Sequence, residues 1–387
     1  MEYALSELFT LQMGKTPSRD NSSYWKKSEN NWISIADLTN SGKYISNTKE
    51  TLSDSAVAES GIKKIPANTV IMSFKLSLGK VAITEKEMYS NEAIMAFIDK
   101  GVEKISPEYL YYLLRAKDWS KGTNKAVMGA TLNKATLSTI KIQLHEYDNQ
   151  LEIVNMLNRV SSSIDFRKQQ LTKLDELIKA RFVEMFENNT YPKVKVSTVC
   201  DFITKGTTPP NDLISEEYSS DKVPYLKVYN LSFNGELLFD TAPQYISENI
   251  HNGMLARSKV YPNDVLMNIV GPPLGKFSLV TDEFPEWNIN QAIAIFRAKE
   301  KINPKYLLSA LMQPEVLNPF LRQAVGIRQL NLSLSQCRDL EIFLPPLSLQ
   351  NQFAAFVAEV DKSKVGVQKA LDQTQLLFDS LMQQYFG

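Results

Sequence analysis

The sequence is poor in the residues that build metal centres and disulfide frameworks. Its 387 residues include two cysteines, Cys200 and Cys337, and two histidines, His145 and His251. Two cysteines so far apart cannot make a disulfide framework or a four-ligand zinc site. Two histidines offer equally little for a metal centre or a catalytic triad. We therefore expect no metal site in this chain.

Long apolar runs and a net charge are also absent. No stretch approaches the run of about 18 apolar residues that a membrane span requires. The N-terminal segment has no basic stretch followed by an apolar core, so nothing marks the chain for export, and we expect a cytoplasmic protein. The 43 basic and 43 acidic residues cancel. This balance argues against a surface covered in basic charge but allows local basic stripes.

Motifs for nucleotide or cofactor binding are missing as well. The segment from Gly271 to Gly275, followed by Lys276, has the wrong spacing for a phosphate-binding loop and lacks the Ser or Thr that would bind magnesium. No dinucleotide fingerprint follows a strand. Asn318, Pro319 and Phe320 resemble the Asn-Pro-Pro-aromatic motif of amino-methyltransferases, but the second proline and a glycine-rich cofactor loop are missing. These absences favour a binding protein over an enzyme.

What the sequence does contain is an internal repeat. Residues 144–186 align with 344–386 at a constant offset of 200, and apolar positions coincide without a gap. Upstream the match continues with gaps, and the Gly14, Thr16, Pro17 turn corresponds to Gly206, Thr208 and Pro209. No paired carboxylates and no Cys/His sets recur between the halves, as a duplicated active site would require. Two similar halves predict two similar binding faces and a two-part target.

Each half is predicted to be a mixed α/β domain followed by a long helix. Runs such as 81–83 and 93–98 are typical of short buried strands. A helix is expected after Ser106 and Pro107 and again after Asn303 and Pro304, because Ser or Asn can cap the first turn and proline suits its first position. The predicted parts are a first domain at 1–145, a helical spacer at 146–190, a second domain at 191–345 and a C-terminal helical spacer at 346–387.

The two long helices carry the pattern of a coiled-coil seam, with apolar residues repeating every seven positions. The residues predicted to pair the helices are Leu157, Ile164, Leu171, Ile178, Val357, Val367, Leu371 and Phe378. Polar residues such as Arg167 and Lys364 fall at different seam positions in the two copies, which favours pairing of one helix with the other. The alternative is that each helix packs separately on its own domain. A helix of about 39 residues is about 58 Å long, a ruler of roughly 17 base pairs.

A possible nucleic-acid interface is indicated by charge segregation. Acidic residues are absent between Asp118 and Glu146, between Glu315 and Asp339, and from Gly61 to Thr84, whereas basic residues occur in all three stretches. Loops without carboxylates can approach phosphates and base edges. The candidate DNA-binding residues are Lys15, Lys75, Lys80, Lys121, Lys125, Asn133, Lys276, Arg322, Arg328 and Asn331. The alternative is an ordinary solvated surface, and the turn at Lys15 could serve only to shape the chain.

Several of these marks occur together in one known family. They are the Gly-Thr-Pro turns, the aromatic residues Trp32 and Tyr225, the Leu-Pro-Pro-Leu run at 344–347 ahead of Gln350, and the two heptad helices, in duplicated order. In these features the whole chain resembles the specificity subunit of type I restriction-modification systems. The first half departs from the pattern, with His145 in a Leu-His-Glu-Tyr run, where we expect a structural role.

The resemblance implies a fold and a function. It implies two target recognition domains, each reading half of a bipartite DNA site, separated by two long helices that pair antiparallel in a pseudo-twofold internal repeat. Two modification subunits carrying S-adenosylmethionine and the methylation chemistry would dock on the helical region, and restriction subunits would join them. The chain itself would bind no cofactor and would not be catalytic. The alternatives are a scaffold that bridges proteins without touching DNA and, more remotely, an enzyme with its own methyltransferase site.

Overall fold

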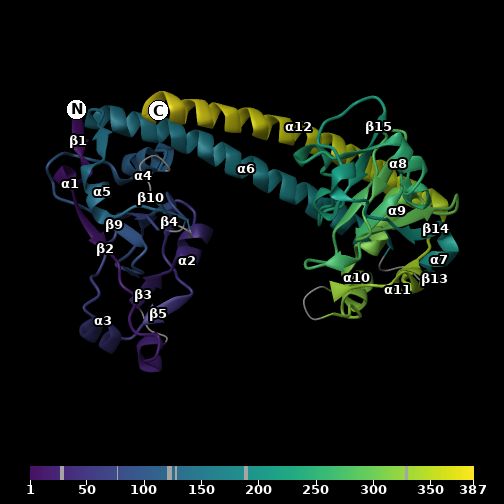
Figure 1. Ribbon diagram of the computed structural model, residues 1–387, viewed down its shortest axis with the longest axis horizontal. Helices are drawn as coiled ribbons and strands as arrows, with labels where there is room; N and C mark the ends of the chain where they lie inside the picture. The colour runs from purple at the N-terminus through teal and green to yellow at the C-terminus, as the bar shows by residue number, and fades with distance from the viewer. Residues whose placement is uncertain (27–29, 76, 120–123, 127–128, 187–190, 327–329) are drawn as a thin grey trace. The chain divides into compact units, whose positions relative to one another are not determined.

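The chain forms two compact units, and both long helices are divided between them. The computed structural model describes residues 1–387 except 27–29, 76, 120–123, 127–128, 187–190 and 327–329, and it describes only the backbone of 124–126 and 129–131. Unit 1 comprises Met1–Arg167 with Ala370–Gly387, and unit 2 comprises Lys168–Lys369. Each long helix therefore contributes one segment to each unit (Figure 1).

The elements of unit 1 are mostly short. In chain order they are β1 (Glu2–Ala4), α1 (Leu5–Leu8), β2 (Phe9–Met13), the 3-10 turn η1 (Ser22–Trp25), β3 (Asn30–Ile33), α2 (Ile35–Asn40), β4 (Tyr44–Ile45), β5 (Glu50–Leu52) and α3 (Asp54–Ser60). Next come β6 (Val70–Ser73), β7 (Val81–Thr84), β8 (Tyr89–Ser90), β9 (Ile94–Asp99), α4 (Pro107–Ala116), β10 (Asn124–Ala126), β11 (Gly129–Thr131), α5 (Lys134–Thr139), β12 (Lys141–Gln143) and the start of α6 (Tyr147–Phe186). The strands predicted at 81–83 and 93–98 are confirmed as β7 and β9.

The central sheet of unit 1 has the order β2-β9-β6-β7-β4, and a second sheet has the order β5-β3-β8. Strand β6 shows why these runs are apolar at every position. Successive side chains of a strand point to opposite faces. Val70 and Met72 lie in one hydrophobic core with the aromatic helix α4, whereas Ile71 lies in another. The central strands are thus covered on both faces.

Unit 2 repeats this plan with different lengths. Its first elements are β13 (Lys193–Lys195), α7 (Val196–Val199), β14 (Cys200–Lys205), η2 (Asn211–Leu213), β15 (Lys222–Leu226), η3 (Val228–Asn230), η4 (Phe239–Thr241), β16 (Tyr245–Ser247), α8 (Glu248–Asn252), η5 (Ala256–Ser258) and β17 (Lys259–Val260). They are followed by β18 (Val265–Asn268), β19 (Val270–Gly271), β20 (Phe277–Leu279), β21 (Trp287–Ile289), β22 (Ile293–Ala298), α9 (Pro304–Leu311), α10 (Pro314–Leu321), β23 (Leu330–Asn331), α11 (Leu334–Asp339), β24 (Glu341–Phe343) and α12 (Leu347–Phe386).

The sheets of unit 2 match those of unit 1 strand for strand at their centres. The order β14-β22-β18-β20 corresponds to β2-β9-β6-β7, and the parallel pair β15-β21 corresponds to β3-β8. Even the unusual backbone is repeated, because Asn68 and Asn263 both adopt a left-handed conformation with φ of 57° and 71°. Asparagine tolerates that region better than most residues. The repeat found in the sequence is therefore a repeat of three-dimensional structure.

Both domains are closed at their base by a pair of short strands. In unit 1, β1 pairs antiparallel with β12, and in unit 2, β13 pairs antiparallel with β24. The strand that leads into each domain thus lies beside the strand that leads out of it towards a long helix. The units group each domain with helix segments, so the four-part division made from the sequence stays a prediction about how the chain is organised.

A buried glutamine from each long helix binds the backbone at the start of α4 and of α9. The Ser106 side chain makes no capping hydrogen bond, so that part of the prediction is wrong, whereas Asn303 does cap α9 by accepting from the amide of Lys305. The backbone amide of Ser106 donates to Oε1 of Gln150 at 3.0 Å. In unit 2 the amide of Asn303 donates to Oε1 of Gln350 at 2.8 Å. Each glutamine, at the start of a long helix, joins that helix to its domain.

The long helices pair antiparallel in both units. In unit 1, near the start of α6, His145 contacts Tyr385 near the end of α12, and the C-terminus lies beside these first turns (Figure 1). In unit 2, near the end of α6, Phe182 and Phe186 both pack edge-on against Phe353 near the start of α12. The alternative of two separately packed helices is therefore wrong. Among the described residues, no helix is long and apolar enough to cross a membrane.

The residues predicted to pair the helices are placed as follows. Leu157, Ile164 and Phe378 are buried in the core of unit 1, with Leu371 packed against it. Val357 is buried in the core of unit 2, with Ile178 packed against it. Leu171 and Val367 are half-buried near the limits of unit 2. Because seam positions alternate three and four residues apart, they return to the same side of each helix about once per turn.

Polar residues interrupt the seam at different places in the two units. In unit 1, Nη1 of Arg167 donates to Oγ1 of Thr374. In unit 2, the ammonium of Lys364 is buried, with 8% of the residue exposed, and pairs with Asp175 on the other helix. Such unequal polar positions are a known way of fixing which helices pair and in what register.

Candidate nucleic-acid interface

In unit 2 the structure brings together two acid-free stretches that are far apart in sequence. The segment after β18 contains Lys276, and the segment after α10 contains Arg322 and Asn331. Strand β19 pairs with β23, so that Val270 lies opposite Asn331. The amide of Leu332 also donates to the carbonyl of Ile269 at 2.9 Å. One continuous surface without carboxylates of its own thus results from two loops.

Unit 1 joins the equivalent stretches in the same way. The amide of Leu132 donates to the carbonyl of Phe74 at 3.0 Å, which places the end of the β10-β11 hairpin beside the loop that follows β6. That loop carries Lys75 and Lys80, and the hairpin contains Lys125. Each unit therefore presents one pair of loops, which we call the paired loops. Loops of this kind can reach phosphates and base edges.

A buried polar side chain at the end of a central strand shapes the first of the paired loops. In unit 1, Oγ of Ser73 accepts from the amide of Lys80 at 3.0 Å. In unit 2, Oδ1 of Asn268 accepts from the amide of Lys276 at 2.7 Å, and its Nδ2 donates to the carbonyl of Pro273 at 2.8 Å. Both residues are fully buried. Their bonds hold the loop backbone at the point where the candidate lysine emerges.

The candidate lysines and arginines at the paired loops are exposed or half-buried. Lys80 is exposed, and Lys75 is half-buried with its Nζ 5.3 Å from the centre of the Phe74 ring. Lys276 is half-buried with its Nζ 5.7 Å from the Phe233 ring. Arg322 directly follows α10 and is exposed. The ammonium groups of Lys75 and Lys276 thus each lie near an aromatic ring.

Other candidates are structural or fall where no side chain is described. Oδ1 of Asn133 caps α5 by accepting from the amide of Thr136 at 2.7 Å. Asn331 is exposed within β23. Lys125 lies in β10 opposite Ala130, with its side chain outside the described atoms. Lys121 and Arg328 lie outside the described residues. Asn133 therefore has a structural task in addition to any contact with a ligand.

The turn that contains Lys15 packs closely against the backbone of a neighbouring segment, and the equivalent turn of unit 2 does the same. A Cβ on Gly14 would collide with the carbonyl oxygens of Ser90 and Asn91, and one on Gly206 would collide with those of Ile289 and Asn290. Nζ of Lys15 donates to the carbonyl of Ser60. This geometry explains why each half has glycine here.

An aromatic residue on the neighbouring strand holds each turn. The indole Nε1 of Trp32 donates to the carbonyl of Lys15 at 3.0 Å, and the hydroxyl of Tyr225 donates to the carbonyl of Thr207 at 3.1 Å. Both aromatic residues are almost fully buried. Because tryptophan and tyrosine carry a polar group at the end of an apolar body, they can fill the core and bond the turn at once.

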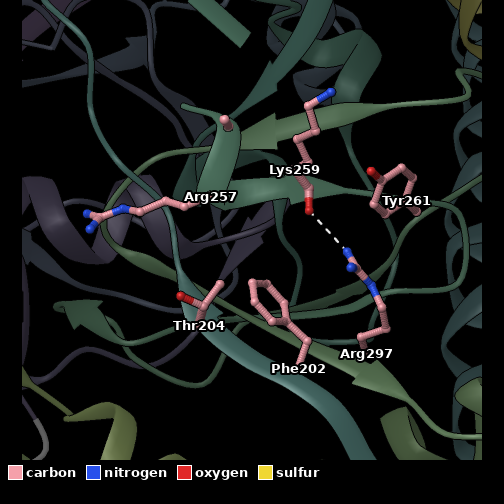
Figure 2. Close-up of a pocket in the computed structure, with 7 residues that line it drawn as sticks. Phe202, Thr204, Arg257, Lys259, Tyr261 and Arg297 are labelled. Carbon is pink, nitrogen blue, oxygen red and sulfur yellow. Dashed lines mark hydrogen bonds between the residues drawn. The ribbon is translucent and has the colours of Figure 1, made fainter. Parts of the chain in front are cut away.

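A pocket of about 310 Å³ opens in unit 2 and is lined by basic and aromatic residues. Arg297 forms a bidentate pair with Asp264 at 2.9 and 2.7 Å, which raises the pKa of the guanidinium. Figure 2 shows that Arg257 and Lys259 point away from Arg297. Lys259 pairs with Glu286 at 3.2 Å. Since the side-chain cations do not converge on one point of the pocket, the pocket lacks the arrangement that would bind an anion.

The histidines and cysteines occupy structural positions. Nδ1 of His145 lies 2.7 Å from the hydroxyl of Tyr109, so this residue joins the start of α6 to α4. Burial lowers the pKa of His251, whose Nε2 lies 2.8 Å from Glu286. Burial raises the pKa of the Cys200 and Cys337 thiols to about 12, which leaves them unreactive at neutral pH. Within the described ranges, no three His, Cys, Asp or Glu side chains are grouped to hold a metal ion.

A comparison with protein families decides what this duplicated architecture is. The family model described as the type I restriction modification DNA specificity domain matches the chain twice, at residues 1–176 and 188–374. The chain belongs to this family. The two matches coincide with the two halves of the repeat, so each paired-loop surface lies in one specificity domain.

Curated relatives agree with this assignment. The chain is 28% identical over 179 residues to the MjaIX specificity subunit of Methanocaldococcus jannaschii and 29% identical over 189 residues to the HindI specificity subunit of Haemophilus influenzae. These matches cover 45% and 46% of this chain and span 40% of the length of each relative.

Two solved structures share the fold over nearly the whole chain. A chain from a study of complex assembly and conformational transition of the type I R-M system covers 100% of this chain and 97% of its own length, with a TM-score of 0.60 and 16% identity. The S subunit of the type I system from M. genitalium covers 99% of this chain and 94% of its own length, with a TM-score of 0.52 and 13% identity.

Sequence reasoning missed the residues that hold the paired loops and the domain bases. Ser73 and Asn268 end strands whose other residues are apolar, and a polar residue that closes an apolar run was the available signal. Gln150 and Gln350 sit at the same offset of 200 as the rest of the repeat. An identical polar residue within an apolar repeat predicts a shared buried hydrogen bond.

Proposed function

We propose that this chain is a DNA specificity subunit that recognises a bipartite DNA site and directs methyltransferase and restriction subunits to it. The observation that carries the proposal is the pair of acid-free loops found once in each of two specificity domains. A duplicated binding surface suits a target with two half-sites. The long antiparallel helices, each of 40 residues, would set the separation of those half-sites.

The subunit acts in this proposal without catalysis of its own. Its thiols are buried, and the family it belongs to is defined by DNA specificity. The methylation chemistry and S-adenosylmethionine would belong to two partner modification subunits, and the complex would work in the cytoplasm on double-stranded DNA. The rival proposal, a scaffold that never touches nucleic acid, predicts that the assembled complex retains no duplex.

Footprinting of the chain assembled with its modification partner tests the proposal directly. We expect two protected half-sites separated by unprotected sequence. A single contiguous site would contradict the two-domain assignment, and failure to retain any duplex would favour the scaffold. The half-sites themselves can be found beforehand by mapping methylated adenines in the host genome.

The paired loops of unit 2 should contribute to the salt dependence of DNA binding. We expect the double variant Lys276→Ala, Arg322→Ala to bind less tightly and to show a shallower dependence of log affinity on log salt. Each lost phosphate contact reduces the slope by about 0.9. The matched control is Lys301→Ala, an exposed lysine outside the acid-free stretches. An unchanged slope in the double variant would remove both residues from the interface.

A further inference from the structure

One buried cation in unit 2 joins three elements that are distant in sequence. Lys364 lies in the seam of α12 with 8% of the residue exposed. Its Nζ is 2.7 Å from Oδ1 of Asp175 on α6 and also pairs with the carboxylate of Glu236, on the loop between η3 and η4. We call these three residues the positioning cluster. It connects both long helices to the domain of unit 2.

The loop that carries Glu236 is itself fastened to the sheet. The hydroxyls of Ser232 and Ser278 both donate to the carbonyl of Glu236 at 2.8 Å. Nδ2 of Asn234 donates to Oδ2 of Asp175 at 3.2 Å, a second bond from the same loop to α6. The positioning cluster therefore ties the sheet strand β20, through a short loop, to one point on the helix pair.

An ionic contact of this kind constrains geometry more sharply than apolar packing does. Burying an ammonium is costly unless charged partners stay within hydrogen-bond distance. A domain that slid or tilted on the helices would keep much of its apolar contact but would separate Glu236 from Lys364. Polar contacts at single seam positions are the best attested use of buried charge for fixing register.

We propose that Lys364, Asp175 and Glu236 hold the domain of unit 2 at one position on the helix pair and thereby restrict the half-site spacing that the protein accepts. The inference rests on the proposed DNA function. All three act as positioning residues, because none of them lies on the paired loops. Loss of the cluster should widen the range of spacings bound without changing the bases read.

The first experiment measures domain position without DNA. Spin labels on Leu213→Cys in the domain and Ala355→Cys, at an exposed position on α12, report one distance within unit 2, and both native thiols are buried. Glu236→Gln keeps the shape of the side chain and leaves Lys364 paired with Asp175. We expect it to widen the distance distribution, whereas Glu283→Gln, an exposed glutamate of the same domain, leaves the width unchanged. Equal widths in all three proteins would overturn the proposal.

The second experiment measures spacing preference with the assembled complex. Duplexes carry the same two half-sites separated by the native spacer or by one base pair more or fewer. We expect Glu236→Gln and Lys364→Met to lower the preference for the native spacer by about tenfold, since a hydrogen bond between charged groups can shift an equilibrium by that factor. Lys364→Arg, which keeps the charge, should retain most of the preference. Methionine suits the apolar seam, so Lys364→Met should stay folded.

The two experiments separate failure of the inference from failure of the proposed function. If the wild-type complex binds no duplex, the DNA function is wrong, and the distance widths alone decide whether the cluster positions the domain. If the widths increase but the spacing preference does not fall, the link between the cluster and spacing is overturned. A fall in preference that Lys364→Arg avoids would support the whole proposal.

Discussion

The loop that reaches the long helices carries Lys43 in unit 1, whereas the corresponding loop of unit 2 carries Glu236. Lys43 pairs with Glu108 of α4 at 2.6 Å and donates to Asn158 of α6 at 2.7 Å. Glu236 pairs with Lys364 of α12. The loop of unit 1 thus uses a cation that pairs with α4 and donates to a neutral side chain of α6, whereas the loop of unit 2 uses an anion that pairs directly with α12.

Other contacts are the same in both units down to the atom. Each unit has a glycine pressed against two carbonyl oxygens and a glutamine whose Oε1 accepts from the residue before a proline. A backbone path that excludes a Cβ admits one residue type, whereas an ion pair works with either sign as long as the partner changes too. The units therefore agree where the backbone is constrained and differ where only complementarity is required.

The largest expected effect is a loss of stability when the tightly packed glycine found in both units is replaced. Gly14→Ala and Gly206→Ala should each lower the free energy of unfolding by about 3 kcal/mol, because the added methyl group meets backbone atoms that cannot rotate away. Urea unfolding followed by tryptophan fluorescence measures both. The control is Gly366→Ala in α12, where nothing lies within 4 Å, and which should stabilise the helix by about 1 kcal/mol. A large loss in only one of the two variants would break the equivalence of the turns.

The buried glutamines should give a smaller and equal pair of effects. Gln150→Leu and Gln350→Leu remove the acceptor of one buried amide each, so we expect a loss of about 2 kcal/mol in unfolding free energy for both. Gln352→Ala, at an exposed position on α12, should change the stability little. Calorimetric unfolding midpoints provide the measurement. Losses that differ strongly between Gln150 and Gln350 would show that the two domain bases are not interchangeable.

The smallest expected effect is a dependence of stability on pH, which should differ between the two units. Burial raises the pKa of Glu108, but hydrogen bonds from Lys43, Tyr44 and Asn158 outweigh it and hold this pKa below the ordinary value of 4.5. A carboxyl group with a lowered pKa in the folded state contributes stability above pH 4.5, and this contribution is lost as the pH falls through the folded pKa. The pKa of Lys364 is raised, because its two carboxylate partners outweigh the effect of burial. Its contribution is therefore present below the ordinary lysine pKa of 10.5 and lost as the pH rises through the folded pKa.

A comparison of variants from pH 7 down through the acid range below pH 4.5 tests this difference. The stability gap between wild type and Glu108→Gln should shrink as the pH falls, whereas the gap between wild type and Lys364→Met should not change for this reason. Denaturant unfolding at several pH values measures both gaps. A Glu108→Gln gap that stays constant until wild type itself unfolds in acid would show that the Lys43 contact does not depend on the charge of Glu108.

Local patterns predicted the elements well, and contacts between distant segments escaped prediction. The heptads and the apolar runs mark α6, α12, β7 and β9 because period and burial are written in neighbouring residues. The cap predicted at Ser106 is absent, and the bonds from the amides of Ser106 and Asn303 to Gln150 and Gln350 were not predicted, because these partners are 44 and 47 residues apart in the chain. No local signal shows such contacts.

The candidate interface was predicted in outline. The acid-free stretches were visible as a charge pattern, and the structure joins them in pairs through β19-β23 and through the bond from Leu132 to Phe74. The hydrogen bonds that Ser73 and Asn268 make to these loops depend on the path of the loop that follows each strand. Composition does not specify that path. The positioning cluster escaped for the same reason, since its three residues come from three distant segments.

The way α12 divides between the units has a consequence for how the protein is made. Unit 2 is one continuous segment, but the core of unit 1 includes Phe378, which leaves the ribosome about 200 residues after Arg167. At about 5–20 residues per second this delay is on the order of 10–40 s. During synthesis, the first unit therefore exposes the apolar surface that awaits α12 for the whole time in which the second unit is made. The N-terminal unit, although made first, therefore cannot complete its core before the whole of unit 2 has been synthesised.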